Sequence, residues 1–200
     1  MSLDHLHAAT ANAAAASTLT KVQVSGDLTL SGGQPANFYR DDGVGVVWGA
    51  NGVNRFIGSD EREYLVGADA NDTIEGGGGA DTIEGGNDDD LLLGGAGNDN
   101  IVGGEGRDVL YGNQEADYLN GRQGDDTMFG GQGNDFLDDS YGHNVLYGNM
   151  GNDTLSMGGN DASTLYGGQG DDHLIGSRGD DLLFGNLGDD TLGGGGGRTI

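Results

Sequence analysis

The sequence of 200 residues contains no cysteine, so no disulfide bond can stabilise the fold and nothing in the composition reports the redox compartment. Basic residues are scarce: 8 Lys and Arg stand against 33 Asp and Glu, and the formal net charge is −25. This charge argues against nucleic acid or an anionic membrane as a partner. No run of about 18 apolar residues is present, so no transmembrane helix is expected. A Sec-type signal peptide is not expected either, because the first residues lack a basic region.

Known catalytic motifs are missing as well. The four histidines are His5, His7, His143 and His173, and none lies in the H-E-x-x-H motif of zinc proteases. The sequence has no G-x-S-x-G nucleophile elbow. His143 and His173 are expected at the surface of a turn and a strand, and the other two in an N-terminal tail. We therefore expect that the protein is not an enzyme.

Glycine, by contrast, is abundant (44 residues), and it recurs with a fixed period. Between Gly67 and Gly193 a nine-residue unit, Gly-Gly-x-Gly-x-Asp-x-apolar-x, is repeated about fourteen times, most clearly at 94–102, 130–138 and 167–175. One such unit cannot bury its apolar residue alone, so the units must stack on one another.

The eighth position of the unit is apolar in every copy. Its residues are Ile74, Ile83, Leu92, Ile101, Leu110, Leu119, Met128, Leu137, Leu146, Leu155, Leu165, Leu174, Leu183 and Leu192. Residues that favour strands surround it, whereas the glycines at positions 1, 2 and 4 suit a turn and disfavour a helix. We predict a six-residue turn and a three-residue strand for each unit, with two units in each coil of about 18 residues.

The sixth position is acidic in nearly every copy, and Asn144 and Ser163 are the exceptions. In a two-unit coil, equivalent turns lie about 4.8 Å apart, which stacks these residues in two columns. One column contains Asp81, Asp99, Asp117, Asp135, Asp153, Asp172 and Asp190; the other begins with Asp72, Asp90, Asp108 and Asp126 and weakens at Asn144 and Ser163.

Stacked carboxylates require a cation. Two unit charges about 5 Å apart repel by about 0.8 kcal/mol in water and about 3 kcal/mol at an effective dielectric of 20. Over both columns the repulsion rivals the 5–15 kcal/mol that stabilises a typical domain. Carboxylate and turn carbonyl oxygens favour Ca²⁺ over Mg²⁺. We predict several calcium ions, with the ligands Asp72, Asp81, Asp90, Asp99, Asp108, Asp117, Asp126, Asp135, Asn144, Asp153, Asp172, Asp181 and Asp190.

The nonapeptide resembles the calcium-binding repeat of RTX (repeats-in-toxin) proteins. The resemblance implies an all-β protein, a parallel β-roll (a β-helix solenoid), and secretion by a type I system with an uncleaved C-terminal signal. That signal normally follows the repeats, whereas this sequence stops at 194–200, which leaves the export route open. Disorder would not explain an apolar residue at every ninth position, although we expect it in the calcium-free state.

The N-terminal third divides differently. We expect residues 1–20 to form an Ala-rich tail that is flexible or weakly helical, and 67–200 to form the calcium-binding β-roll. Residues 21–66 contain degenerate repeats with Phe56 and Leu65 at the eighth position, and we interpret this region as a small β cap. A separate small binding domain is the alternative.

The nine-residue period contains one extra residue at Met157, and this insertion predicts a bulge there.

Three functions fit these features. The first is an extracellular structural or adhesive protein of a surface layer or matrix. The second is the repeat module of a larger type I-secreted enzyme or toxin, and the third is an ice-binding solenoid. Nothing after Leu192 resembles a cap. An uncovered last coil would pair head to tail with another copy and form filaments, unless a further C-terminal segment caps it.

Overall fold

The computed structural model describes residues 38–41, 44–49 and 52–196, and every regular element within them is a β-strand. The expected tail, 1–20, lies outside the described residues. The strands are β1 (Phe38–Asp41), β2 (Val44–Trp48), β3 (Arg55–Ile57), β4 (Glu63–Asp69), β5 (Thr73–Gly78), β6 (Thr82–Asn87), β7 (Leu91–Ala96), β8 (Asn100–Glu105), β9 (Val109–Gln114), β10 (Tyr118–Gln123), β11 (Thr127–Gln132), β12 (Phe136–Asp139), β13 (Val145–Met150), β14 (Thr154–Met157), β15 (Thr164–Gln169), β16 (His173–Ile175), β17 (Leu182–Leu187) and β18 (Thr191–Gly193). No helix in this part of the chain is long and apolar enough to cross a membrane.

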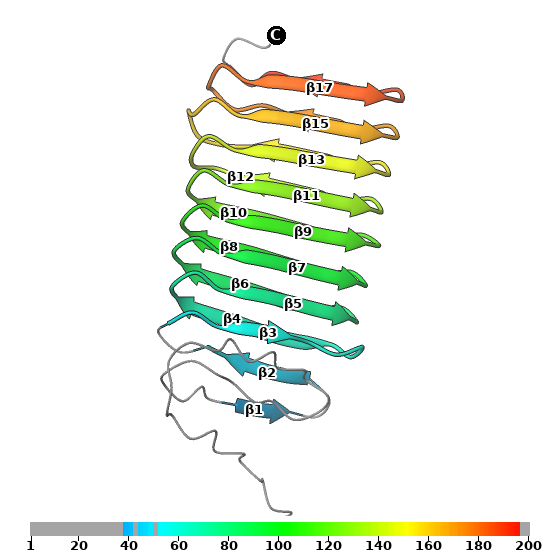
Figure 1. Ribbon diagram of the computed structural model, residues 1–200. Coiled ribbons are helices and arrows are strands. Elements are labelled where there is room, and N and C mark those ends of the chain that lie inside the picture. Colours follow the sequence, from blue (N-terminus) through cyan, green and yellow to red (C-terminus); the bar gives the residue numbers. More distant parts are fainter. Residues whose placement is uncertain (1–37, 42–43, 50–51, 197–200) are drawn as a thin grey trace, which may run out of the picture.

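The strands form two sheets that face each other along a solenoid (Figure 1). The ten-stranded sheet has the order β1-β2-β4-β6-β8-β10-β12-β14-β16-β18, and the eight-stranded sheet contains the odd-numbered strands from β3 to β17. Neighbours pair in parallel, as in Thr73↔Leu91, and only β1 and β2 pair antiparallel. Each coil thus takes one strand from each sheet, and the predicted all-β parallel β-roll is confirmed.

The strands are longer than predicted. Most have six residues instead of three, because the ladder resumes after a bend at the first glycine of the next unit. In β5 and β7 the pair Glu75↔Leu93 is followed by Gly77↔Gly95. A Cβ on Gly77 would lie 2.4 Å from the carbonyl oxygen of Ser59, and the φ angle of Gly77 is 104°. The pairing between strands therefore continues through the glycines, which the sequence predicted to lie in the turn alone.

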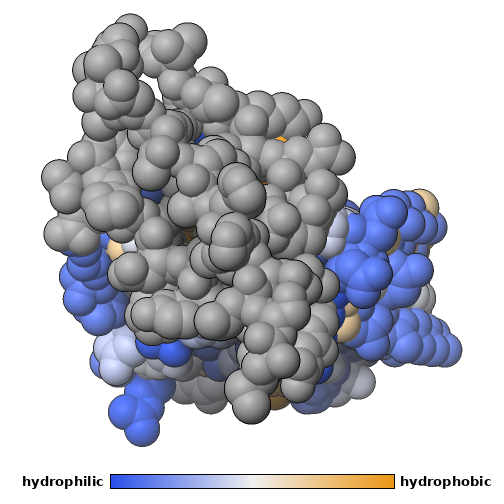
Figure 2. Space-filling model, turned by 90° about the horizontal axis from the view of Figure 1, so that it is seen from below, coloured by the Kyte–Doolittle hydropathy of each residue, from blue (hydrophilic) through white to orange (hydrophobic). Residues whose placement is uncertain are grey.

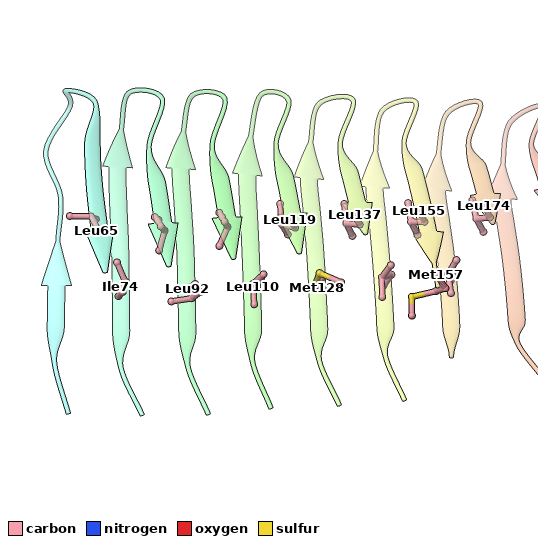
Figure 3. Packing of buried hydrophobic residues seen from close by; sticks show 14 of the residues in the cluster. Leu65, Ile74, Leu92, Leu110, Leu119, Met128, Leu137, Leu155, Met157 and Leu174 are labelled. Atoms are coloured by element: carbon pink, nitrogen blue, oxygen red, sulfur yellow. The ribbon is translucent and has the colours of Figure 1, made fainter. Parts of the chain in front are cut away.

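The core is a double row of side chains from the eighth position (Figure 3). Nearly all of these side chains are fully buried, beginning with Phe56 and Leu65 of the degenerate repeats. Leu192 is the exception to the predicted core, because it is 44% exposed. It lies on β18, the last strand of its sheet among the described residues, so no following coil covers it there.

The sequence predicted a bulge at Met157, where the nine-residue period has one extra residue. This prediction is wrong. Met157 ends β14, pairs with Asp139 and is buried in the core (Figure 3). The register is 18 residues at this pair and 19 residues at Val145↔Thr164. The insertion therefore lies in the turn after Met157, where Gly159 has a φ angle of 75°. An apolar side chain is more stable in the core, and a glycine-rich turn accepts the added residue.

A row of aromatic rings runs along the outer face of the odd-numbered sheet. Tyr111, Phe129, Tyr147, Tyr166 and Phe184 occupy the ninth position on successive strands, with neighbouring ring centroids 4.7–4.9 Å apart and ring planes within 9° of parallel. Each stacked pair adds about 0.5–1.5 kcal/mol beyond its buried area. The ladder therefore reinforces the stacking of coils from outside the core.

The degenerate repeats continue the same ladder. Strand β3 pairs with β5, and β2 pairs with β4, both in parallel. The coils run without a break across the predicted boundary between 66 and 67. The division into a cap (21–66) and a roll (67–200) therefore remains a proposal about the role of the first coils. Figure 2 views the solenoid along its axis from this end, and the turns that project at its sides are hydrophilic.

Candidate metal centre

The aspartates at the sixth position are held in two columns by hydrogen bonds between coils. The Oδ1 atom of each accepts the backbone N–H of the sixth residue one coil earlier. For Asp117 this donor is Asp99, at 2.8 Å, and the N–H of Asp117 in turn donates to Asp135 Oδ1 at 2.9 Å. Asp72, Asp90 and Asp108 continue the same pattern in the other column. One carboxylate oxygen of each of these aspartates thus hydrogen-bonds adjacent coils to each other.

The other carboxylate oxygen has no partner. In ten of the predicted ligands Oδ2 is buried and accepts no hydrogen bond: Asp72, Asp81, Asp90, Asp99, Asp108, Asp117, Asp126, Asp135, Asp153 and Asp172. A buried acceptor without a partner costs about 1–3 kcal/mol, and more when it is charged. The same unpartnered oxygen recurs at 18- or 19-residue intervals, which indicates that these turns bind one kind of ligand.

Glycine at the first position of the unit makes room for this oxygen. A Cβ on Gly112 would lie 2.3 Å from Asp117 Oδ2 and 2.5 Å from the carbonyl oxygen of Gly130, one coil further on. Gly148 has the same relation to Asp153. A carboxylate oxygen and a carbonyl oxygen from adjacent coils therefore converge beside each such glycine.

The donor set fits calcium. Ca²⁺ takes six to eight oxygen ligands in flexible geometry, including carboxylates and backbone carbonyls. Within the described residues no three His, Cys, Asp or Glu side chains converge on one point. An ion between two turns would therefore take oxygens from one or two aspartates and complete its coordination with main-chain carbonyls.

Burial makes these carboxyl groups weak acids in the absence of a cation. It raises the pKa of Asp117 to about 8, and repulsion from Asp99 and Asp135 adds to the effect. Burial likewise raises the pKa of Asp108 to about 7 and that of Asp135 to about 6, while a backbone hydrogen bond to each opposes the shift. At neutral pH the group with the highest pKa of these, Asp117, is mostly protonated unless it faces a positive charge.

Two predicted ligands have their oxygens occupied by protein groups. Asp181 Oδ2 accepts the N–H of Ser177 at 2.6 Å and its hydroxyl at 3.1 Å. The side chain of Asn144 accepts the N–H of Asp126 at 2.8 Å and donates through Nδ2 to the carbonyl of Tyr141 at 3.0 Å. Neither of these two side chains leaves a carboxylate oxygen free.

Two further sixth-position residues differ from the ten aspartates. One is Ser163 in the second column, and the other is Asp190 at the end of the first. Ser163 has only a hydroxyl, and this accepts the N–H of Asn144 at 3.1 Å. Asp190 is only partly buried, and its Oδ1 accepts the N–H of Asp172 at 3.0 Å. The second column therefore loses its free oxygens after Asp126, whereas the first retains them through Asp172.

One acidic residue in the interior is not among the ligands predicted from the sequence. Asp139 takes the first position of its unit, where glycine is usual, and its side chain is fully buried with Oδ2 unpartnered. The break in the glycine pattern was the available signal. His143 and His173 are exposed, as predicted.

These features define a parallel β-roll with stacked acidic turns that are suited to divalent cations. The family model of the RTX calcium-binding nonapeptide repeat (4 copies) matches residues 57–92, 66–101, 93–128, 102–137, 129–165, 157–192 and 166–200. The chain belongs to this family, and the resemblance found in the sequence is confirmed. A comparison with curated proteins gave no match.

Proposed function

We propose that the protein is a secreted solenoid that folds when calcium fills its two columns of turns. The unpartnered Oδ2 atoms of the ten aspartates carry this proposal. A cation beside each oxygen would remove both the unmet hydrogen-bonding capacity and the repulsion within the column. In this role Asp117 acts through Oδ2, and its Oδ1 holds the turn in place through Asp99.

Calcium binding and folding are then one equilibrium, because the unfolded chain does not bring two turns together. A ligand that binds only the folded state stabilises it by RT ln(1 + [L]/Kd) for each site. Extracellular calcium modules have Kd values of about 10⁻⁴–10⁻³ M. Cytosolic calcium lies far below this range, so the proposal has the chain fold after export. RTX repeats are typical of secreted proteins, which supports this location.

Circular dichroism with and without calcium tests the proposal. We expect a coil-like spectrum in chelator and a β spectrum in millimolar calcium, with magnesium as the control ion, since Mg²⁺ requires stricter octahedral geometry. A β spectrum that survives exhaustive chelation at neutral pH would remove the basis for calcium-dependent folding.

For the biological role we propose a structural or adhesive protein without catalytic activity. A fold built only of repeats is of a type that is typically non-catalytic, and it supports this role. The second candidate is the repeat module of a larger type I-secreted enzyme or toxin. The full-length gene distinguishes the two, because an adjoining catalytic or pore-forming domain would favour the second.

Ice binding has less support. It requires a regular outward row of threonine and asparagine. On the odd-numbered sheet the seventh position instead alternates irregularly between threonine and apolar residues, as at Thr73, Leu91, Val109 and Thr127.

Self-assembly through the last coil is part of the proposal. Strands β17 and β18 are the last in their sheets among the described residues, and Leu187 and Leu192 there are 67% and 44% exposed. A strand edge with exposed apolar side chains favours pairing, either with another copy, as we propose, or with a further C-terminal segment. Light scattering in millimolar calcium should show a mass that rises with protein concentration. A constant monomer mass would rule out head-to-tail assembly.

A further inference from the structure

Asp139 departs from the repeat in a way that the repeat itself does not explain. It ends β12 at the first position of its unit, and its side chain is fully buried. Its Oδ1 accepts the N–H of Ser140 at 2.6 Å and that of Tyr141 at 3.3 Å. Its Oδ2 has no partner. These hydrogen bonds fix the orientation of the carboxyl group and leave one oxygen directed into the interior.

The free oxygen lies beside a second one. A Cβ on Gly121 would be 2.3 Å from Asp139 Oδ2 and 2.3 Å from Asp126 Oδ2. Asp126 is 1% exposed, and its Oδ2 is also unpartnered. Two buried carboxyl oxygens from adjacent coils therefore lie next to each other, and no other described group donates a hydrogen bond to either of them.

The comparable site one coil earlier shows what Asp139 replaces. Beside Gly103 the two nearest oxygens are Asp108 Oδ2 at 2.3 Å and the carbonyl oxygen of Gly121 at 2.8 Å. Beside Gly121 the two nearest oxygens are Asp126 Oδ2 and Asp139 Oδ2, each at 2.3 Å. The nearest oxygen from the next coil is thus a carboxyl oxygen, whereas beside Gly103 it is a main-chain carbonyl oxygen.

The same turn has lost its usual carboxylate. Its sixth position is Asn144, whose Oδ1 accepts the N–H of Asp126 and whose Nδ2 donates to the carbonyl oxygen of Tyr141. Asp139 comes from the same turn as Asn144 and is directed at the same neighbour. The carboxyl group of this turn is therefore at the first position instead of the sixth, and it lies next to the carboxyl group of Asp126.

On the other side of Asp139, one coil further on, the side chains at the first and sixth positions have no free oxygen that could bind a cation. Its pairing partner one coil further on is Met157, which is 5% exposed and points into the core (Figure 3). The next turn has Ser163 at its sixth position, and the hydroxyl of this residue already accepts a hydrogen bond. Among the described residues, Asp126 has the unpartnered buried oxygen that lies nearest to Asp139 Oδ2.

We propose that Asp126 and Asp139 form a divalent-cation site in which Asp139 substitutes for the missing carboxylate at position 144. The ligand is a hard cation, Ca²⁺ in an extracellular setting, held by these two carboxylates together with main-chain carbonyls. Among the described residues the site is the last one of its column, and Asp139 completes it at the point where the sixth-position pattern breaks. This inference rests on the proposed calcium function.

The test counts calcium ions on the full chain. Asp139→Asn keeps the size of the side chain and removes its charge, and Asp139→Gly restores the usual residue of the repeat. Asp138→Asn is the matched control, because Asp138 is the adjacent acid on β12 and is only partly buried. Each protein is stripped of metal, reloaded with calcium and examined by native mass spectrometry and calorimetric titration, with circular dichroism to confirm folding.

We expect both Asp139 variants to bind one calcium ion fewer than the Asp138→Asn control, or to bind that ion at least about tenfold more weakly, while the other ions are retained. An unchanged number and affinity in Asp139→Asn would overturn the inference, and would assign Asp139 as a protonated group of the core. Absence of calcium from the unaltered protein would instead refute the proposed function, so the two failures are distinguishable.

Discussion

Acid should stabilise the metal-free protein and destabilise the calcium-loaded one. The perturbation is a change from pH 7 to pH 4 in metal-free buffer. Burial raises the pKa of Asp117 from 3.8 to about 8, and that of Asp81 and Asp153 to about 7. In the unfolded chain these groups have ordinary values, so folding at pH 7 requires each of them to take up a proton or to bury a charge.

The magnitude follows from the size of the shift. One pKa unit corresponds to 1.36 kcal/mol, so a carboxyl group with a folded-state pKa of about 7 destabilises the metal-free fold by about 4 kcal/mol at pH 7. Asp90 and Asp108 have the same value of about 7. The summed destabilisation from Asp81, Asp90, Asp108, Asp117 and Asp153 exceeds the 5–15 kcal/mol that stabilises a typical domain. The metal-free chain should therefore be unfolded at neutral pH.

The sign of the pH dependence is opposite in the two states. Below pH 3.8 the carboxyl groups are protonated in both the folded and the unfolded chain, and the penalty vanishes. It grows as the pH rises from 3.8 to the folded-state values of about 6 to 8, because only the unfolded chain ionises in that window. With calcium bound, acid instead displaces the ion by protonating its ligands.

Circular dichroism and thermal melting at pH 4, 5, 6 and 7 provide the assay. In metal-free buffer the β signal and the Tm should rise as the pH falls, and in millimolar calcium they should fall. Metal-free stability that is constant or increases from pH 4 to pH 7 would refute the reasoning, because the aspartates could then not be buried as described.

Three further predictions concern single positions. Asp117→Ala should weaken two calcium sites and Asp190→Ala only one, and calorimetric titration that shows equal losses would contradict the two-column arrangement. Leu119→Ala should destabilise the loaded protein by about 2–5 kcal/mol in denaturant titration, since the side chain is fully buried. Tyr147→Ala should reduce stability by about 1–3 kcal/mol, because it removes two stacked ring pairs; a loss below about 0.5 kcal/mol would mean that the ladder does not reinforce the coils.

The regular part of the fold could be predicted from the sequence because one rule repeats. An apolar residue at every ninth position specifies the core, and glycine at fixed positions specifies the turn. The length of the strands could not be predicted in this way. Whether Gly77 and Gly78 join a ladder depends on the partner strand one coil further on, and three glycines in isolation indicate only a turn.

The departures from the repeat were harder to interpret. An insertion near Met157 is evident from the period, but its location depends on which residue the core accepts. Asp181 fits the pattern, yet its oxygen is occupied by Ser177, and only the structure brings these two side chains together. Asp139 resembles a lost glycine in the sequence, and its contact with Asp126 requires knowledge of the register between coils.

Crystallography of the calcium-loaded protein with anomalous scattering tests the central claim most directly. We expect calcium peaks next to the unpartnered Oδ2 atoms of the aspartates in both columns. They should extend through Asp172 in one column and end at Asp126 and Asp139 in the other, with no peak beside Asp181. Density without calcium in the columns, or a fully occupied ion between Ser163 and Asp181, would contradict the account.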